Sequence, residues 1–250
     1  MSANKITSGT KEWADSNINI FLGCSNDCIY CYAKRMAVVR FGRTTSKEWK
    51  NMKLNLTAYN KEYRKRKGRI MFPTSHDITE DSLAACLEVI RKLVMAENEI
   101  LLTTKPSIIC IHKIINIFGA FKDQIQFRFT ITSDNNAILK HYEPGAPPFI
   151  ERMGALILAY KAHWKTSVSI EPFLDLNPVP LIMKVIPYCT ESIWLGKLNY
   201  MQTDFNTWSN IKKIIFQVQN LPPEIKNKIR FKDSIRNLFK AKTGERLVLT

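Results

Sequence analysis

The sequence has 250 residues, 45% of them apolar and 24% charged, which is enough apolar material for one sizeable folded domain. It contains no run of about 18 apolar residues, which excludes a membrane-spanning helix. The first residues lack the apolar stretch of a secretory signal. We therefore expect a cytoplasmic protein with no membrane partner.

The net charge of +15 is concentrated in two segments. Residues 34–69 hold thirteen Lys and Arg against two Glu, and residues 212–246 hold ten against three acidic residues. Clustered positive charge favours a polyanionic partner, most simply nucleic acid, because basic side chains neutralise phosphates. Solvated helix faces or an acidic protein partner are the alternatives.

Helix-length and strand-length segments alternate along the chain. Apolar or alternating runs predict the strands, and amphipathic stretches predict the helices. In chain order we expect a strand at 17–22, helices at 32–42 and 46–66, a strand at 69–73, a helix at 79–98 capped by Thr79 or Asp77, a strand at 99–104, a helix ending near 118, a strand at 124–132, a helix at 149–163, a strand at 166–170, a helix at 178–187, a strand at 192–196, and basic helices at 205–218 and 225–240.

Six strands separated by helices predict a mainly parallel sheet whose outside is covered by the helices. We therefore expect an α/β fold, a partial (β/α)6 TIM-type barrel, with a doubly wound sheet as the alternative. The expected divisions are an N-terminal tail at 1–16, a core at 17–204 and a basic helical C-terminal extension at 205–250 that packs on the core. In either fold the chemistry gathers at the C-terminal ends of the strands.

Three of the six cysteines lie within eight residues. Cys24, Cys28 and Cys31 have C-x3-C-x2-C spacing, and Tyr30 precedes the third. Thiolates are the usual ligands of iron–sulfur clusters, and a cubane normally takes four, so three leave one iron open to a small molecule. A structural zinc site needs a second ligand pair, which this sequence lacks. The remaining cysteines, which we expect to be small core residues, are Cys86, Cys110 and Cys189.

This motif resembles that of the radical S-adenosylmethionine (SAM) superfamily, C-x3-C-x-aromatic-C. Over about residues 17–200, three further blocks look like the spore photoproduct lyase-related branch: Thr103–Pro106, Thr130–Asn135 and Glu143–Pro148. The resemblance implies a [4Fe–4S] cluster on the three cysteines and SAM on its open iron. It also implies a reductase, flavodoxin or ferredoxin as electron donor, and SAM cleavage to a 5′-deoxyadenosyl radical that abstracts hydrogen from a substrate.

The resemblance also assigns residues to SAM. Tyr30 is the motif aromatic, Ser75 would bind the methionine amino end, Lys105 would approach the carboxylate, and Thr132 and Ser133 would face the ribose. These pairings are chemically sensible, since a cation suits a carboxylate and hydroxyls suit an amine or ribose. The alternatives are an exposed lysine at a helix start for Lys105 and a helix cap for Ser133.

Four polar residues follow predicted strands and are candidate catalytic groups. His76 and Asp77 follow the second strand and could form an acid–base pair, or cap the loop. Glu171 follows the fifth strand and could bind substrate, or form a loop salt bridge. Lys197 ends the sixth strand and could meet an anionic substrate.

Aromatic residues interleave with lysines and arginines in residues 34–69. The spacing of Trp49, Tyr59 and Tyr63 approximates a helical period and favours a core stripe, with a base-stacking platform that includes Phe41 as the alternative. If duplex DNA or structured RNA is the substrate, the target base must flip out to reach the barrel.

We therefore expect a radical SAM enzyme that acts on a nucleic-acid base or nucleotide by modification, rearrangement or lyase chemistry. In the resembled lyase a cysteine that donates hydrogen follows the second strand, whereas this sequence reads Phe72-Pro73-Thr74-Ser75 there. This departure indicates another substrate than the spore photoproduct. The alternatives are a radical SAM enzyme acting on a peptide or small metabolite, and a zinc-bearing, non-catalytic nucleic-acid-binding module.

Overall fold

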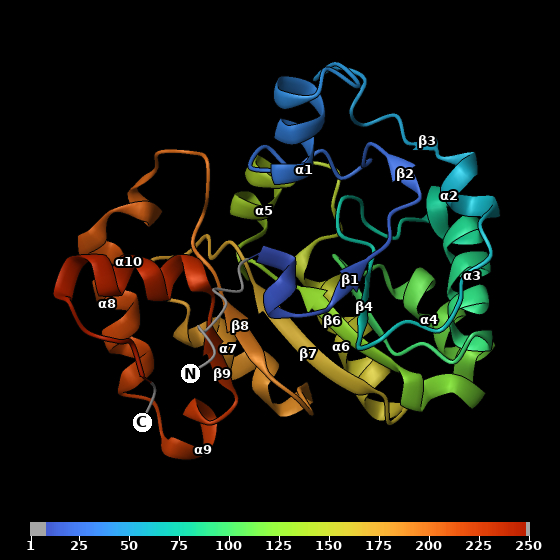
Figure 1. Ribbon diagram of the computed structural model, residues 1–250. Coiled ribbons are helices and arrows are strands. Elements are labelled where there is room, and N and C mark those ends of the chain that lie inside the picture. Colours follow the sequence, from blue (N-terminus) through green and yellow to red (C-terminus); the bar gives the residue numbers. More distant parts are fainter. Residues whose placement is uncertain (1–8, 249–250) are drawn as a thin grey trace, which may run out of the picture.

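A parallel sheet organises the molecule. The computed structural model describes residues 9–248. Its main sheet has the order β1-β4-β5-β6-β7-β8-β9, and every neighbouring pair is parallel (Figure 1). The strands are β1 (Ser16–Asn17), β4 (Ile70–Phe72), β5 (Ile100–Thr104), β6 (Ile125–Thr130), β7 (Lys165–Ile170), β8 (Ile193–Leu195) and β9 (Ile229–Phe231).

The helices lie outside the curled sheet, so the expected partial barrel is confirmed. Figure 1 shows α3 and α4 on one side and α8 and α10 beside the end of the sheet that carries β9. The helices are α1 (Tyr32–Arg35), continued by a π-helical turn (Met36–Arg40), α2 (Leu56–Asn60), α3 (Glu80–Met95), α4 (Ile108–Phe118), α5 (Asn136–Tyr142), α6 (Phe149–Lys161), α7 (Val179–Val185), α8 (Trp208–Gln219), α9 (Pro223–Lys226) and α10 (Asp233–Thr243).

The two faces of the sheet differ in chemistry. On β6, Ile125, Phe127 and Phe129 face the main apolar core, where α3, α4 and α6 pack. Gln126 and Arg128, which alternate with them, are buried polar residues of the opposite face. Because side chains alternate along a strand, one face packs against helices while the other lines the interior of the half-barrel.

The expected number of six strands is wrong, because the main sheet has seven. β9 was predicted inside a helix at 225–240, but its three residues pair with Ile193–Leu195 of β8. A segment of three residues has no period long enough to separate strand from helix, so its pairing partner decides its structure.

The expected helix at 46–66 is also wrong over most of its length. β3 (Lys53–Leu54) pairs antiparallel with β2 (Phe21–Leu22), and only α2 is helical. The backbone N–H of Arg66 donates to Asn98 Oδ1 at 2.8 Å, and the Asn98 amide donates to the Arg64 carbonyl at 3.3 Å. These contacts with the end of α3 hold the basic run in a non-helical path. The expected strand at 17–22 is likewise divided between β1 and β2.

The expected capping of α3 by Thr79 is confirmed by a capping box, in which the Thr79 N–H donates to Ser82 Oγ at 2.9 Å. Among the described residues, no helix combines the length and apolarity that crossing a bilayer requires. The tail expected at 1–16 lies partly outside the described residues; within it, Trp13 is buried against Trp194 at a centroid distance of 5.8 Å. The divisions at 17 and 205 remain predictions.

The segment after residue 204 is required for folding if β9 completes the sheet. Truncation after Asp204 removes β9 and exposes β8. It also removes seven almost fully buried apolar residues. Burial of each one stabilises the fold by about 1.5–3 kcal/mol, whereas the whole free energy of unfolding of a typical protein is about 5–15 kcal/mol. We expect no cooperative thermal unfolding. Truncation after Gly244 keeps all helices and strands and serves as the control. A cooperative transition in the shorter fragment would contradict the role of β9.

Candidate active site

A cavity of about 830 Å³ opens at the C-terminal ends of the strands. Its walls include residues that follow or end six of them: Ser75 after β4, Lys105 after β5, Thr130 on β6, Glu171 after β7, Lys197 after β8 and Lys232 after β9. The site therefore lies where chemistry is expected in parallel α/β folds.

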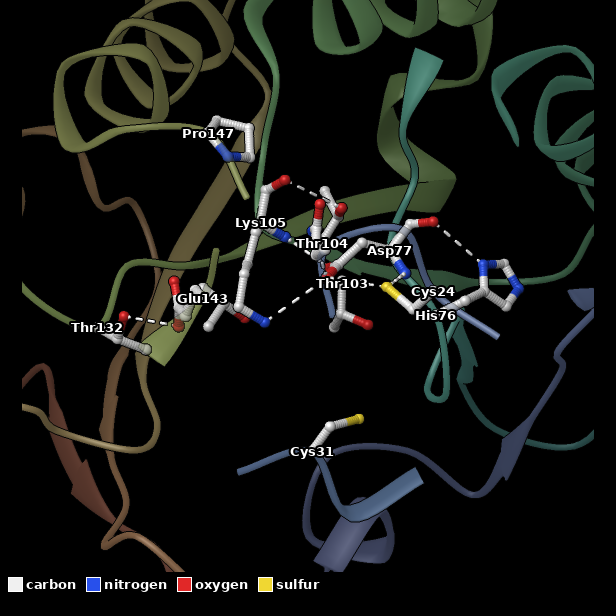
Figure 2. A network of polar contacts seen from close by, with 12 residues as sticks. Cys24, Cys31, His76, Asp77, Thr103, Thr104, Lys105, Thr132, Glu143 and Pro147 are labelled. Atoms are coloured by element: carbon white, nitrogen blue, oxygen red, sulfur yellow. Dashed lines mark hydrogen bonds and ion pairs between the residues drawn. The ribbon is translucent and has the colours of Figure 1, made fainter. Parts of the chain in front are cut away.

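The cysteine loop forms one wall of this cavity. Cys24, Cys28 and Cys31 all line it. Gly23 has φ +102°, and a Cβ there would lie 2.5 Å from the Trp49 carbonyl oxygen, so only glycine fits where the loop begins. Cys31 is the N-cap of α1, its Sγ accepting from the Lys34 N–H at 3.4 Å. Figure 2 shows the Cys31 thiol across an open space from Cys24 and Asp77.

The three thiols of the motif are free and line the same cavity. Burial raises the pKa of Cys24 to about 12 and raises the pKa values of Cys28 and Cys31, so a bound cation is needed to form thiolates here. Within residues 9–248, no three His, Cys, Asp or Glu side chains are grouped to hold a metal ion. A cubane takes one thiolate per iron, and the three cysteines of the motif all line this cavity.

A buried ion pair joins the loop after β4 to the end of β5, and its carboxylate also binds the cysteine loop. Asp77 Oδ2 lies 3.5 Å from Lys105 Nζ and accepts from the Asn26 amide at 2.8 Å, while its Oδ1 accepts from the Lys105 backbone N–H at 2.8 Å (Figure 2). Burial alone raises the pKa of Asp77, but the Lys105 ammonium and these N–H groups hold it below its usual range. Asp77 therefore stays ionised and acts as an anchor.

Lys105 is a cation inside the cavity. Its side chain is only 11% exposed, which contradicts the alternative of an exposed lysine at a helix start. Burial lowers its pKa, but Asp77 outweighs this and holds the pKa of Lys105 above its usual value. The ammonium also lies 5.8 Å from the centre of the Tyr30 ring. This geometry can present a positive charge to a carboxylate.

A second buried carboxylate, Glu143, holds the cysteine loop from the other side. The Tyr30 hydroxyl donates to Glu143 Oε1, Thr132 Oγ1 donates to the same oxygen at 2.9 Å, and Arg152 Nη2 lies 2.5 Å from Oε2. Next to it, the Gly145 N–H donates to the Asn26 carbonyl at 3.1 Å, and a Cβ on Gly145 would lie 2.3 Å from the Ser25 carbonyl oxygen. The loop at 143–147 therefore packs closely against the cysteine loop and forms hydrogen bonds with it.

Comparisons with known proteins agree with this geometry. No family model matches the chain. By sequence, 178 residues are 24% identical to the uncharacterized protein ORF301 of Acidianus two-tailed virus, a match covering 67% of this chain and 58% of that protein. Among solved structures, a point mutant of spore photoproduct lyase gives a TM-score of 0.52 at 15% identity, over 90% of this chain and 67% of the lyase. Streptococcus suis SuiB bound to S-adenosylmethionine gives 0.51 at 10% identity, over 90% of this chain and 48% of SuiB.

The chain shares its fold with spore photoproduct lyase and SuiB. The resemblance expected from the cysteine motif is confirmed at the level of the fold. The chain spans less than two thirds of the viral protein and about half of SuiB.

The two residues expected at the ribose do not line the cavity. Thr132 and Ser133 are fully buried. Thr132 contacts Glu143, and Ser133 Oγ accepts from the Asn135 N–H at 3.0 Å in the turn before α5. The alternative assignment of Ser133 as a helix cap is wrong, because the N-cap of α5 is Asn135, whose side chain accepts from the Ala137 and Ile138 N–H groups. Ser75 does line the cavity, with its N–H donating to Asn19 Oδ1 at 2.8 Å.

His76 is held by the fold through both ring nitrogens. The Ile20 N–H donates to Nε2 at 3.3 Å, and Nδ1 lies 3.1 Å from the Asp77 carbonyl oxygen. The ring also packs edge-on against Phe21 at 5.2 Å. Burial lowers the pKa of His76 to about 4, so the ring is neutral near pH 7. The ring contacts the backbone carbonyl of Asp77, whose carboxylate pairs with Lys105, and both residues line the cavity. Their role as an acid–base pair stays a prediction.

The other candidates, Glu171 and Lys197, also line the cavity. Burial raises the pKa of Glu171, whose carboxylate lies 3.9 Å from Lys232 Nζ. Burial lowers the pKa of Lys197, which donates to Asn199 Oδ1 at 2.9 Å. Lys232 was missed in the sequence because β9 was missed. It is buried, paired with Glu12 at 2.9 Å and 4.0 Å from the Trp13 ring centre.

The Glu143–Arg152 pair is fully buried, so removing one partner leaves an uncompensated charge. We expect Arg152→Met to lower the free energy of unfolding by about 3–5 kcal/mol, measured by urea denaturation. The matched control is Arg91→Met, which breaks an exposed Arg–Glu pair and costs less than about 1 kcal/mol. Equal effects of the two substitutions would contradict a stabilising role for the buried Glu143–Arg152 pair.

The neutral state of His76 predicts a pH dependence. Below pH 6.5 the unfolded chain binds a proton at this histidine and the folded chain does not until about pH 4, so stability is lost as the pH falls through this window. Unfolding free energy measured from pH 6.5 to 4.5 loses up to about 1.4 kcal/mol per pH unit from this group. We expect His76→Asn to flatten the slope by that amount and His112→Asn, at an exposed position of α4, to leave it unchanged. The same slope in His76→Asn as in the wild type would refute the assignment.

Proposed function

We propose that the chain is a radical SAM enzyme that holds a [4Fe–4S] cluster on Cys24, Cys28 and Cys31. One observation carries the proposal: three free thiols with this spacing line the same cavity as a buried lysine, at the C-terminal edge of the parallel sheet. When bound, the cluster and SAM supply one-electron cleavage and a 5′-deoxyadenosyl radical. A reductase, flavodoxin or ferredoxin supplies the electron.

The protein's part is to bind and orient SAM and to exclude side reactions. Lys105 presents its ammonium to the SAM carboxylate, because it is a buried cation on the cavity wall close to the cysteine loop. Ser75 offers a hydroxyl to the amino group from the neighbouring strand end. Tyr30, fixed by Glu143, forms the wall between them. Thr132 and Ser133 act indirectly, through Glu143 and through the turn before α5.

We assign the substrate to the part of the cavity near Glu171 and Lys197, and propose that it is a nucleic-acid base or nucleotide. The net charge of +11 in residues 34–69 supports a polyanionic partner. Within residues 9–248 the cysteines that line the cavity are the three of the motif, so the cavity holds no further thiol to donate hydrogen to a substrate radical. Modification or rearrangement therefore suits this cavity better than photoproduct repair.

Anaerobic reconstitution with iron and sulfide, followed by dithionite and SAM, tests the enzyme class. We expect 5′-deoxyadenosine by chromatography, abolished by Cys28→Ala because a motif ligand is lost. Cys86→Ala, which removes a buried thiol on α3 away from the cavity, is the matched control and keeps the activity. A zinc-loaded wild type without 5′-deoxyadenosine, or equal effects of both substitutions, would contradict the proposal.

A further inference from the structure

Two exposed tyrosines stack at the mouth of the cavity. Tyr32 opens α1 and Tyr200 lies in the loop after β8, and their ring centroids are 5.6 Å apart with planes 28° from parallel. Both line the cavity, yet they are 55% and 60% exposed. Large aromatic rings are usually buried when nothing binds them, so an exposed stacked pair beside a cavity indicates a binding surface.

Arginines accompany these rings. The Arg35 guanidinium lies 5.6 Å from the Tyr200 ring centre. Further along the same helical segment, the 51% exposed Phe41 ring lies 4.7 Å from the Arg43 guanidinium and 5.7 Å from that of Arg40. Across the described part of the chain, none of these three arginines forms an ion pair. Their charge is therefore free to meet an anion from outside.

Exposed rings interleaved with unpaired arginines match the chemistry of single-stranded nucleic acid. Bases stack on aromatic rings, and guanidinium groups bind the phosphates between them. In a duplex the faces of the bases are already stacked, so these rings would have nothing to bind. An acidic peptide would form ion pairs with the arginines but has no flat base to stack on the aromatic rings.

We propose that Tyr32, Tyr200, Arg35, Arg40, Phe41 and Arg43 form a docking track for single-stranded nucleic acid that leads into the cavity. The track rests on the proposed function and deepens it, since it names the form in which the substrate base arrives. It also explains why Phe41 is exposed, whereas Trp49 and Tyr63, the other aromatic residues considered in the same basic segment, are buried.

Fluorescence anisotropy with labelled dT12 and a 12-base-pair duplex tests the track on the reconstituted full chain. We expect dT12 to bind more tightly than the duplex. Tyr200→Ala and Phe41→Ala should each weaken dT12 binding by about 5- to 150-fold and change duplex binding less than about twofold, since stacking contributes about 1–3 kcal/mol per base. Arg35→Gln should lower the salt slope by about 1. Phe216→Ala removes a 64% exposed ring beside Lys212 and Lys213 on α8, and this control keeps wild-type binding.

The track is refuted if the duplex or polyglutamate competes as well as dT12, or if Tyr200→Ala and Phe216→Ala behave alike. The two proposals fail separately in the wild type. If the protein produces 5′-deoxyadenosine but binds dT12 equally well with and without the Tyr200 and Phe41 rings, only the track is refuted. Ring-dependent binding without 5′-deoxyadenosine supports the track and refutes the radical enzyme.

Discussion

The buried carboxylate of Asp77 connects the segments that build the cavity. Its oxygens accept from Asn26 in the cysteine loop and from the Lys105 backbone, and the Lys105 ammonium lies 3.5 Å away. An ionised carboxylate is stable in such a place because it is paired and hydrogen-bonded. One side chain thus fixes both the wall that carries the thiols and the cation that faces them. Glu143 holds a second part of the cysteine loop, because it accepts from the Tyr30 hydroxyl and is itself paired with Arg152.

The two carboxylates explain why a loop rich in polar residues can hold buried thiols. Cys24 Sγ accepts from the Asp77 N–H at 3.4 Å, and its thiol lies 3.8 Å from Asp77 Oδ2. The loop is therefore fixed before any cofactor binds, and its ordering does not have to be driven by binding. Such preorganisation is the general requirement for a site that must hold a reactive intermediate away from water.

Local patterns predicted what depends on local sequence. The cysteine spacing, five of the six strand positions and the cap at Thr79 could be read directly, because short-range periodicity and ligand spacing determine them. The errors lie where distant contacts decide. β9 is a strand because β8 is next to it, and residues 61–66 are non-helical because Asn98 binds their backbone. The contact partners of His76 and Asp77 are Ile20 and Lys105, which the sequence does not place beside them.

We propose that three thiols hold a cluster whose open iron binds SAM. Electron paramagnetic resonance of the anaerobically reconstituted, dithionite-reduced protein, together with iron analysis, tests this cofactor assignment. We expect about four irons per chain and a reduced-cluster signal that changes when SAM is added. A protein that takes up zinc instead of iron, or a cluster signal that SAM leaves unchanged, would contradict it.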